Sequence, residues 1–202
     1  MSLKLAKDLF YQKNYKEAQK LFESLDYKYE AGFCAFLSGD EIYAKNIWQR
    51  NNEPCLATSW GLIVLDLIKL KIKNRPTFFQ VRAFLEVYLN LLIENGHLEW
   101  AENLISSCEI LAQSNPETYK FIARVLFANK YYNLTHKFID YSKNIFPLDP
   151  EALLIEAQTY FIEGEFEKAK ESIIDTLSGA PQYHPALEFQ KLIDEKIKNS
   201  QR

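Results

Sequence analysis

The chain of 202 residues is 48% hydrophobic and 25% charged, values of a globular protein rather than of a disordered tail. Its net charge of -3 argues against a nucleic-acid footprint, which needs clustered basic residues. Only 6 Gly and 7 Pro favour helices over a turn-rich β fold. The three cysteines are odd in number and lack pairing spacings, which suits reduced thiols in a cytoplasmic protein. The first residues do not show the pattern of a signal peptide, and no apolar run is long enough to span a bilayer. We therefore expect no membrane insertion.

Residues 1–53 are predicted to form two degenerate helical hairpins. The first hairpin turns near Asn14, and Ala18 follows on the apolar stripe of its second helix. The second hairpin turns at Gly39, and Ala44 takes the role of Ala18. The short interval between these alanines, from position 18 to position 44, indicates short helices and short turns.

Residues 54–81 are predicted to connect this region to the next through long apolar helices. Pro54 breaks the chain, and the apolar pattern predicts a helix over residues 55–73. Thr77 is a candidate N-cap for the following helix.

The helix that follows, residues 78–94, is apolar around most of its circumference. A helix with so little polar surface is expected to lie buried between neighbours.

Residues 82–183 are predicted to contain three repeats of equal length, 82–115, 116–149 and 150–183. The last repeat is the clearest, because Gly164 separates two apolar helical stripes and Pro181 ends the second. Steps of one repeat length take Gly164 to Lys130 and Gly96, and Ala169 to Thr135 and Ala101. The first repeat is the most degraded, with Gln113 at the position of Pro147 and Pro181.

Residues 184–202 are predicted to form a capping helix at the end of the array. The apolar residues Leu187, Leu192, Ile193 and Ile197 share one face, and charged residues occupy the other. A terminal helix of this kind closes a repeat array with its apolar side inward.

The spacing of these hairpins resembles that of the tetratricopeptide repeat (TPR) family, whose period is about 34 residues. The resemblance implies an all-α fold, a right-handed α-solenoid of antiparallel helix pairs. It also implies a concave groove lined by the first helix of each repeat, in which a protein partner binds.

The groove positions of the family can be read onto this chain through the repeat register. They predict an apolar floor crossed by a polar row of Asn90, Arg124 and Gln158. Arg124 could hold a carboxylate in a two-pronged contact, and aromatic residues would be apolar anchors. The predicted partner-binding residues are Asn90, Lys120, Phe121, Arg124, Phe127, Gln158 and Phe161. A terminal helix or the N-terminal repeats folded over the groove would instead make the aromatic residues ordinary core.

One known subset of the family clamps the C-terminal carboxylate of chaperones. Asn90 matches one clamp position, whereas Glu86, Phe121, Glu151 and Ile155 stand where lysine, asparagine or arginine would be needed. We therefore do not expect binding of a chaperone tail.

Nothing in the residue pattern predicts chemistry. The histidines His97, His136 and His184 are scattered, and none has another histidine or cysteine at metal-ligand spacing. The sequence contains no phosphate-binding loop and no nucleophile elbow. We expect no catalytic residues, no metal and no cofactor.

Three functions remain as hypotheses. The favoured one is a non-catalytic module that binds a peptide or an amphipathic helix of a partner protein in its groove. The second is a structural protein that self-associates into a homo-oligomer. The third is an enzyme or a nucleic-acid-binding solenoid, which would need a spatial cluster of reactive side chains or a basic stripe.

Overall fold

The structure is a computed structural model that describes residues 2–50, 55–73, 75–112 and 115–200. Within these ranges all regular structure is helical, which confirms the all-α prediction. The expected break at Pro54 and the degenerate position Gln113 lie outside the described residues. The helices are α1 (Leu3–Tyr11), α2 (Tyr15–Ser24), α3 (Lys28–Leu37), α4 (Glu41–Gln49), α5 (Leu56–Leu67), α6 (Phe78–Ala83), a π-helical segment η1 (Phe84–Leu89), α7 (Asn90–Glu94), α8 (Leu98–Leu111), α9 (Thr118–Ala128), α10 (Tyr132–Ile145), α11 (Pro150–Ile162), α12 (Phe166–Gly179) and α13 (His184–Ser200).

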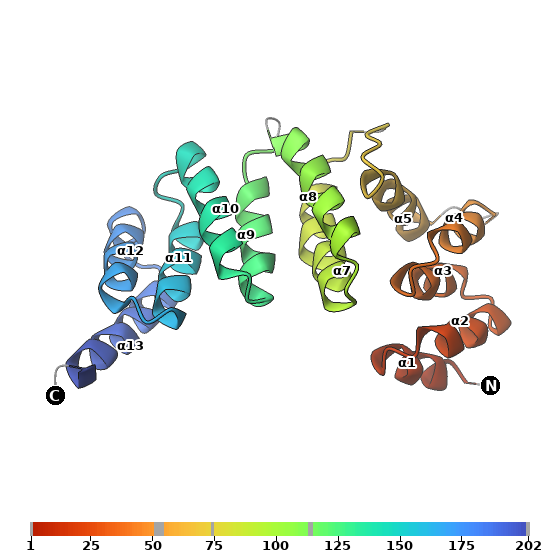
Figure 1. The fold of residues 1–202 in the computed structure, drawn as a ribbon, viewed down its shortest axis with the longest axis horizontal. Helices are drawn as coiled ribbons and strands as arrows, with labels where there is room; N and C mark the ends of the chain where they lie inside the picture. Colours follow the sequence, from red (N-terminus) through yellow and green to blue (C-terminus); the bar gives the residue numbers. More distant parts are fainter. Residues whose placement is uncertain (1, 51–54, 74, 113–114, 201–202) are drawn as a thin grey trace. The chain divides into compact units, whose positions relative to one another are not determined.

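The chain divides into two compact units, Met1–Cys108 and Glu109–Arg202. The ribbon shows that each unit is built from consecutive helices that run back and forth and pack on their neighbours (Figure 1). The division falls inside α8, and therefore inside the first of the three predicted repeats. The repeat boundaries remain a sequence-based prediction.

Two helical hairpins open the N-terminal unit. Helices α1 and α2 pair across Lys13, and α3 and α4 pair across Gly39; both corner residues have a positive φ. Ala18 and Ala44 are fully buried at equivalent places on α2 and α4. Small side chains at these places let the paired helices approach closely, in keeping with the short spacing between the two alanines.

The connecting helix α5 is shorter than predicted. It ends at Leu67 rather than at residue 73, and the chain reverses at Leu70, whose φ is 57°. The Lys71 N–H donates to the carbonyl of Asp66 at 2.9 Å, which closes the helix end. The sequence alone does not predict the helix end at Leu67, because the apolar pattern continues to residue 72.

Helices α6, η1 and α7 follow one another without a break over residues 78–94. Thr77 caps α6 as predicted: its hydroxyl accepts from Gln80 N–H, and its own N–H donates to Gln80 Oε1 at 2.8 Å. The expected burial of this helix holds only in part. Phe84 and Leu85 are buried, but Phe79 is 73% exposed and Val87 is also exposed.

The N-terminal unit contains contacts between hairpins that are distant in sequence. Lys13 Nζ donates to the carbonyl of Glu94 at 3.1 Å, and Tyr15 OH donates to Asn95 Oδ1 at 2.9 Å. His97 Nε2 lies 2.8 Å from the carbonyl of Leu37. The turn between α7 and α8 therefore contacts the α1–α2 hairpin and the α3–α4 hairpin near their turns.

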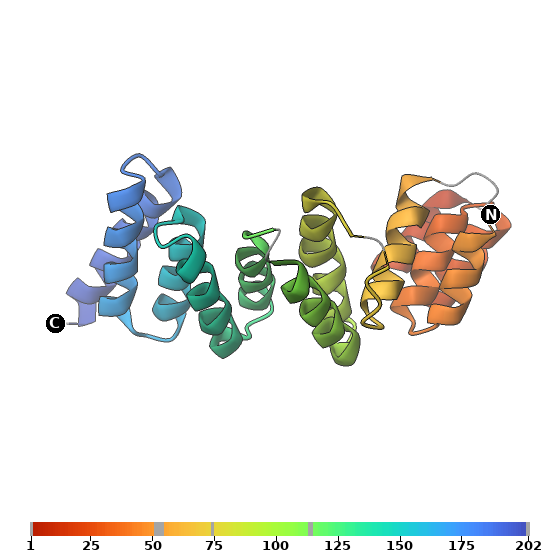
Figure 2. The same cartoon turned by 90° about the horizontal axis from the view of Figure 1, so that it is seen from above.

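The C-terminal unit is a stack in which α9 packs on α10, α10 on α11, and α11 on α12 and α13 (Figure 2). The corner of each pair is a left-handed residue, Lys130 with φ 66° and Gly164 with φ 83°. At both corners the next residue donates its N–H to a carbonyl five residues back, as at Gly96 in the N-terminal unit. Gly96, Lys130 and Gly164 thus form corners at equal spacing, as the sequence predicted.

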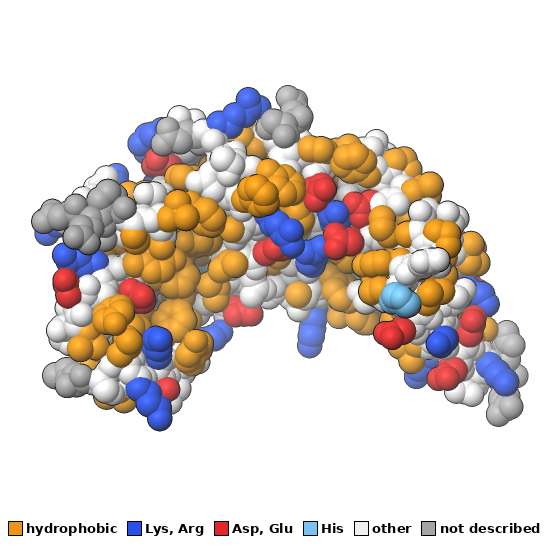
Figure 3. All heavy atoms as spheres, turned by 180° about the vertical axis from the view of Figure 1, so that it is seen from behind, with side chains coloured by type: hydrophobic (Ala, Val, Ile, Leu, Met, Phe, Trp, Pro, Cys, Tyr) orange, Lys and Arg blue, Asp and Glu red, His pale blue; other side chains and the backbone are white. Residues whose placement is uncertain are grey.

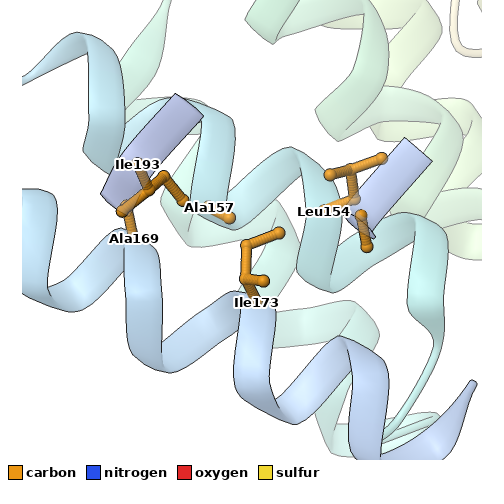
Figure 4. Close-up of a cluster of buried hydrophobic side chains, with 6 residues drawn as sticks. Leu154, Ala157, Ala169, Ile173 and Ile193 are labelled. Carbon is orange, nitrogen blue, oxygen red and sulfur yellow. The ribbon is translucent and has the colours of Figure 1, made fainter. Parts of the chain in front are cut away.

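A buried apolar cluster joins the last three helices of this unit. Ala157 of α11, Ala169 and Ile173 of α12, and Ile193 of α13 meet there (Figure 4). The helix α13 thus closes the stack as predicted, with Leu192 as an exception because that side chain is exposed. Phe189, which was not predicted, packs inward instead.

Candidate partner-binding surface

The first helices of the two C-terminal pairs, α9 and α11, pack against each other. The predicted groove residues Arg124 and Phe127 of α9, and Gln158 and Phe161 of α11, occupy equivalent places on the two helices. All four are half-buried. The structure therefore brings together four of the seven predicted residues as two rows on adjacent helices.

Ile162 adds to these rows and was missed by the sequence analysis. It is 52% exposed and follows Phe161 at the end of α11. The repeat register itself could have found it, because the next groove position of the family falls there. We call Arg124, Phe127, Gln158, Phe161 and Ile162 together the α9–α11 surface.

Lys120 does not contribute to this surface, which corrects the prediction. It is 5% exposed, and its Nζ lies 2.8 Å from Asp149 Oδ2 and 3.1 Å from Glu151 Oε2. Burial lowers the pKa of Lys120, but the hydrogen bonds to Asp149 and Glu151 and their negative charges together raise it by more, so the net shift is upward. The ammonium group joins α9 to the start of α11.

Phe121 is likewise core rather than an anchor for a partner. It is 1% exposed, and the neighbouring groove positions Leu154 and Ile155 on α11 are buried as well. These floor residues are therefore buried, and Leu154 belongs to the apolar cluster that α11 forms with α12 and α13.

Arg124 lies at the edge of this packing with about one third of its side chain exposed. Its Nη2 is 3.1 Å from Glu151 Oε2, and its guanidinium lies over the ring of Phe121 at 5.8 Å. An incoming carboxylate would compete with Glu151 for the guanidinium. The predicted two-pronged contact therefore starts from a residue that already has an acidic partner.

Aromatic contacts hold Phe127 and Phe161 in place. Phe161 meets Phe166 of α12 and Phe189 of α13, each with ring centroids 5.3 Å apart, and Phe127 meets Tyr132 at 6.1 Å. The helix α13 thus covers part of Phe161, as the alternative sequence interpretation allowed. The rest of the ring stays accessible beside Ile162.

Asn90, the remaining predicted residue, belongs to the N-terminal unit. Its Nδ2 donates to Glu94 Oε1 at 2.9 Å, one turn along the same helix. The predicted polar row therefore extends over two units, and only Arg124 and Gln158 lie in the same one.

Charged and apolar side chains mix on the surface of the molecule. Figure 3 shows hydrophobic patches on the N-terminal unit, and side chains of both signs of charge among hydrophobic ones on the C-terminal unit.

His136 Nε2 lies 2.8 Å from Glu163 Oε2, and its ring packs on Tyr160 at 4.5 Å. His97 and His136 thus have structural partners.

Among the described residues, no group of three or more histidine, cysteine or acidic side chains could hold a metal ion. In the same part of the chain no helix combines the length and the apolar character needed to cross a membrane.

No protein-family model matches the chain, and no curated protein matches it. Among solved structures, the chain is similar to the C-terminal part of a TPR repeat-containing protein from Cytophaga hutchinsonii. The identity is 16% and the TM-score 0.49, over 98% of this chain and 72% of the other.

Proposed function

We propose that the chain is a non-catalytic protein-interaction module whose C-terminal unit holds a peptide or an amphipathic helix of a partner protein on the α9–α11 surface. The supporting observation is a match in exposure across the repeat. Arg124 and Gln158 are half-buried one repeat length apart, and so are Phe127 and Phe161. Side chains at equivalent places on parallel neighbouring helices form a regular surface for one extended ligand.

The chemistry of this surface suits a protein segment with an apolar face. Phe127, Phe161 and Ile162 offer accessible carbon, and the aromatic contacts of the two phenylalanines leave them little freedom to lose on binding. Aromatic residues and arginine at the centre of an interface carry most of its binding energy. Because Phe121 and Leu154 are buried, the partner would lie across a shallow surface and not insert into a deep groove.

We place this module in the cytoplasm. Cys34, Cys55 and Cys108 are reduced thiols, and Cys55 is exposed. Exposed thiols persist in a reducing compartment, which supports this proposal.

The test compares two substitutions of equal exposure. Ile162 on the proposed surface is 52% exposed, and Ile174 on α12 is 51% exposed. Ile162→Asp should abolish the capture of a partner from cytosol, whereas Ile174→Asp should leave it unchanged. A second bait, Arg124→Glu with Phe127→Ala, should also lose the partner while its melting temperature falls by only a few degrees.

Three other results would decide against the proposal. Capture of the same proteins by wild type and by Ile162→Asp would move the interface elsewhere. A large loss of stability in Arg124→Glu would show that the ion pair of Arg124 with Glu151 serves mainly to hold the fold. A molar mass that rises with concentration, and that Ile162→Asp returns to the monomer value, would instead assign the surface to self-association.

A further inference from the structure

A cavity of about 250 Å³ lies in the N-terminal unit. It is bounded by α4, by the C-terminal half of α5 and by the segment after α5. Its charged walls are Glu41, Lys45, Asp66, Lys69, Lys71 and Lys73. Four lysines thus face two carboxylates, in a chain whose net charge is -3.

The backbone holds the three lysines after α5 in a defined place. The chain reverses at Leu70, and the Lys71 N–H donates to the carbonyl of Asp66. Two side chains of α8 fix the end of α5 from the other side. Asn103 Nδ2 donates to the carbonyl of Ile68 at 3.0 Å, and Ser107 Oγ donates to the carbonyl of Leu67 at 2.7 Å.

The two carboxylates are engaged by two of the lysines. Lys69 Nζ lies 2.8 Å from Glu41 Oε1, and Lys73 Nζ lies 3.6 Å from Asp66 Oδ1. Lys45 and Lys71 have no ion-pair partner among the described residues. Among the described residues that line the cavity, the lysines therefore exceed the carboxylates by two.

The remaining walls are Gln49, Leu62 and Leu65, of which the two leucines supply the apolar surface. Leu65 is buried, and Leu62 lies one turn before Asp66 on α5. A ligand that combines a compact anion with a small carbon body would match both kinds of wall. The volume is below that of a typical pocket for drug-sized molecules, which begins at about 300 Å³.

We propose that this cavity binds a phosphomonoester, with Lys45 and Lys71 donating to the phosphate oxygens and Leu62 contacting the carbon body. Lysine binds phosphate as a point charge, and two ammonium groups balance a dianion. The phosphate can come from a free small molecule or from a phosphorylated side chain of a protein. The site does not depend on the proposed partner surface, which lies on other helices.

Calorimetric titration of the full chain with inorganic phosphate and with O-phosphoserine tests the proposal. We expect O-phosphoserine to bind, and the double variant Lys45→Gln, Lys71→Gln to bind it about tenfold or more weakly. The matched control is Lys4→Gln, Lys7→Gln, which removes the same charge from two exposed lysines of α1 in the same unit. This control should bind as the wild type does.

A third probe, a peptide with one phosphoserine, distinguishes a free phosphomonoester from a phosphorylated protein as the source of the phosphate. Tighter binding of the peptide than of O-phosphoserine indicates a phosphorylated protein, and equal binding indicates a free phosphomonoester. Equal weakening in both double variants would overturn the proposal, because it would reflect overall charge alone. Unchanged binding in the Lys45, Lys71 variant, or no binding of any probe, would also overturn it.

Discussion

The indole of Trp48 lies directly against the backbone of Gly61. A Cβ built on Gly61 would come 2.6 Å from Trp48 Cζ3, closer than real side chains approach each other. On its other side Trp48 meets Gly32, and its Nε1 donates to the carbonyl of Tyr29 at 3.1 Å. Two glycines within helices, which weaken a helix by themselves, thus make room for one buried ring between α3 and α5.

Replacement of Gly61 by alanine should therefore destabilise the protein by about 1–3 kcal/mol, the usual cost of overpacking. The free energy of unfolding from urea titration measures this. The new methyl group would meet the benzene ring of the indole. Trp48→Phe puts a smaller side chain there, so the double variant should recover part of the loss. Additive losses in the double variant would show that the indole is not the obstacle.

The corners of the C-terminal unit predict opposite effects of two exchanges. Lys130 holds a left-handed backbone with φ 66°, which costs a residue with a Cβ about 1 kcal/mol, so Lys130→Gly should stabilise. Gly164→Ala should destabilise by a similar amount, because a Cβ there meets nothing within 4 Å and only the backbone is strained. Thermal unfolding should show a higher melting temperature for Lys130→Gly and a lower one for Gly164→Ala than for the wild type. A loss of stability in Lys130→Gly would show that the lysine side chain contributes more than the backbone strain.

A buried carboxylate links three helices of the C-terminal unit. Glu156 of α11 is 5% exposed, accepts from Lys143 Nζ of α10 at 2.7 Å and from Ser172 Oγ of α12 at 2.9 Å. Glu156→Ala should lower the free energy of unfolding by about 2 kcal/mol, since it leaves the buried hydroxyl and the ammonium group without their acceptor. Glu156→Gln, which keeps the size and one acceptor, should cost less. Equal losses in the two variants would assign the effect to packing.

The three thiols should differ in reactivity. Cys55 is exposed, and the Thr58 N–H, which donates to its Sγ at 3.5 Å, lowers its pKa. Burial, with a contribution from Glu30, raises the pKa of Cys34 to about 12, and Cys108 is also buried. Iodoacetamide should label Cys55 roughly 100-fold faster than the other two, as mass spectrometry of digested protein would show. Fast labelling that persists in Cys55→Ser would contradict this order.

Lys120, which is buried, and Lys143, which is half-buried, predict a loss of stability at alkaline pH. Burial lowers the pKa of Lys120 and of Lys143, but their carboxylate partners raise both above 10.5 in net effect. Their stabilisation is therefore complete below the unfolded pKa of 10.5 and is lost as pH rises through the folded pKa. Urea midpoints should stay level from about pH 8 to pH 10 and fall above that. Lys120→Met should reduce the fall, and an equal fall in this variant would exclude Lys120 as a cause.

Local patterns in the chain were sufficient to predict the helix pairs and their corners. A left-handed residue and a hydrogen bond five residues back depend only on neighbours in sequence, so Gly96, Lys130 and Gly164 could be placed from their spacing. The cap at Thr77 is local in the same sense.

Exposure required the tertiary structure, because contacts between distant residues determine it. Lys120 is buried because the chain brings Asp149, 29 residues later, and Glu151 beside it, and Phe161 is partly covered because α13 supplies Phe189. The end of α5 at Leu67 likewise involves Asn103 and Ser107 of α8. A helical repeat defines which side chains face a neighbour, and only the packed neighbour decides how much of each remains for a partner.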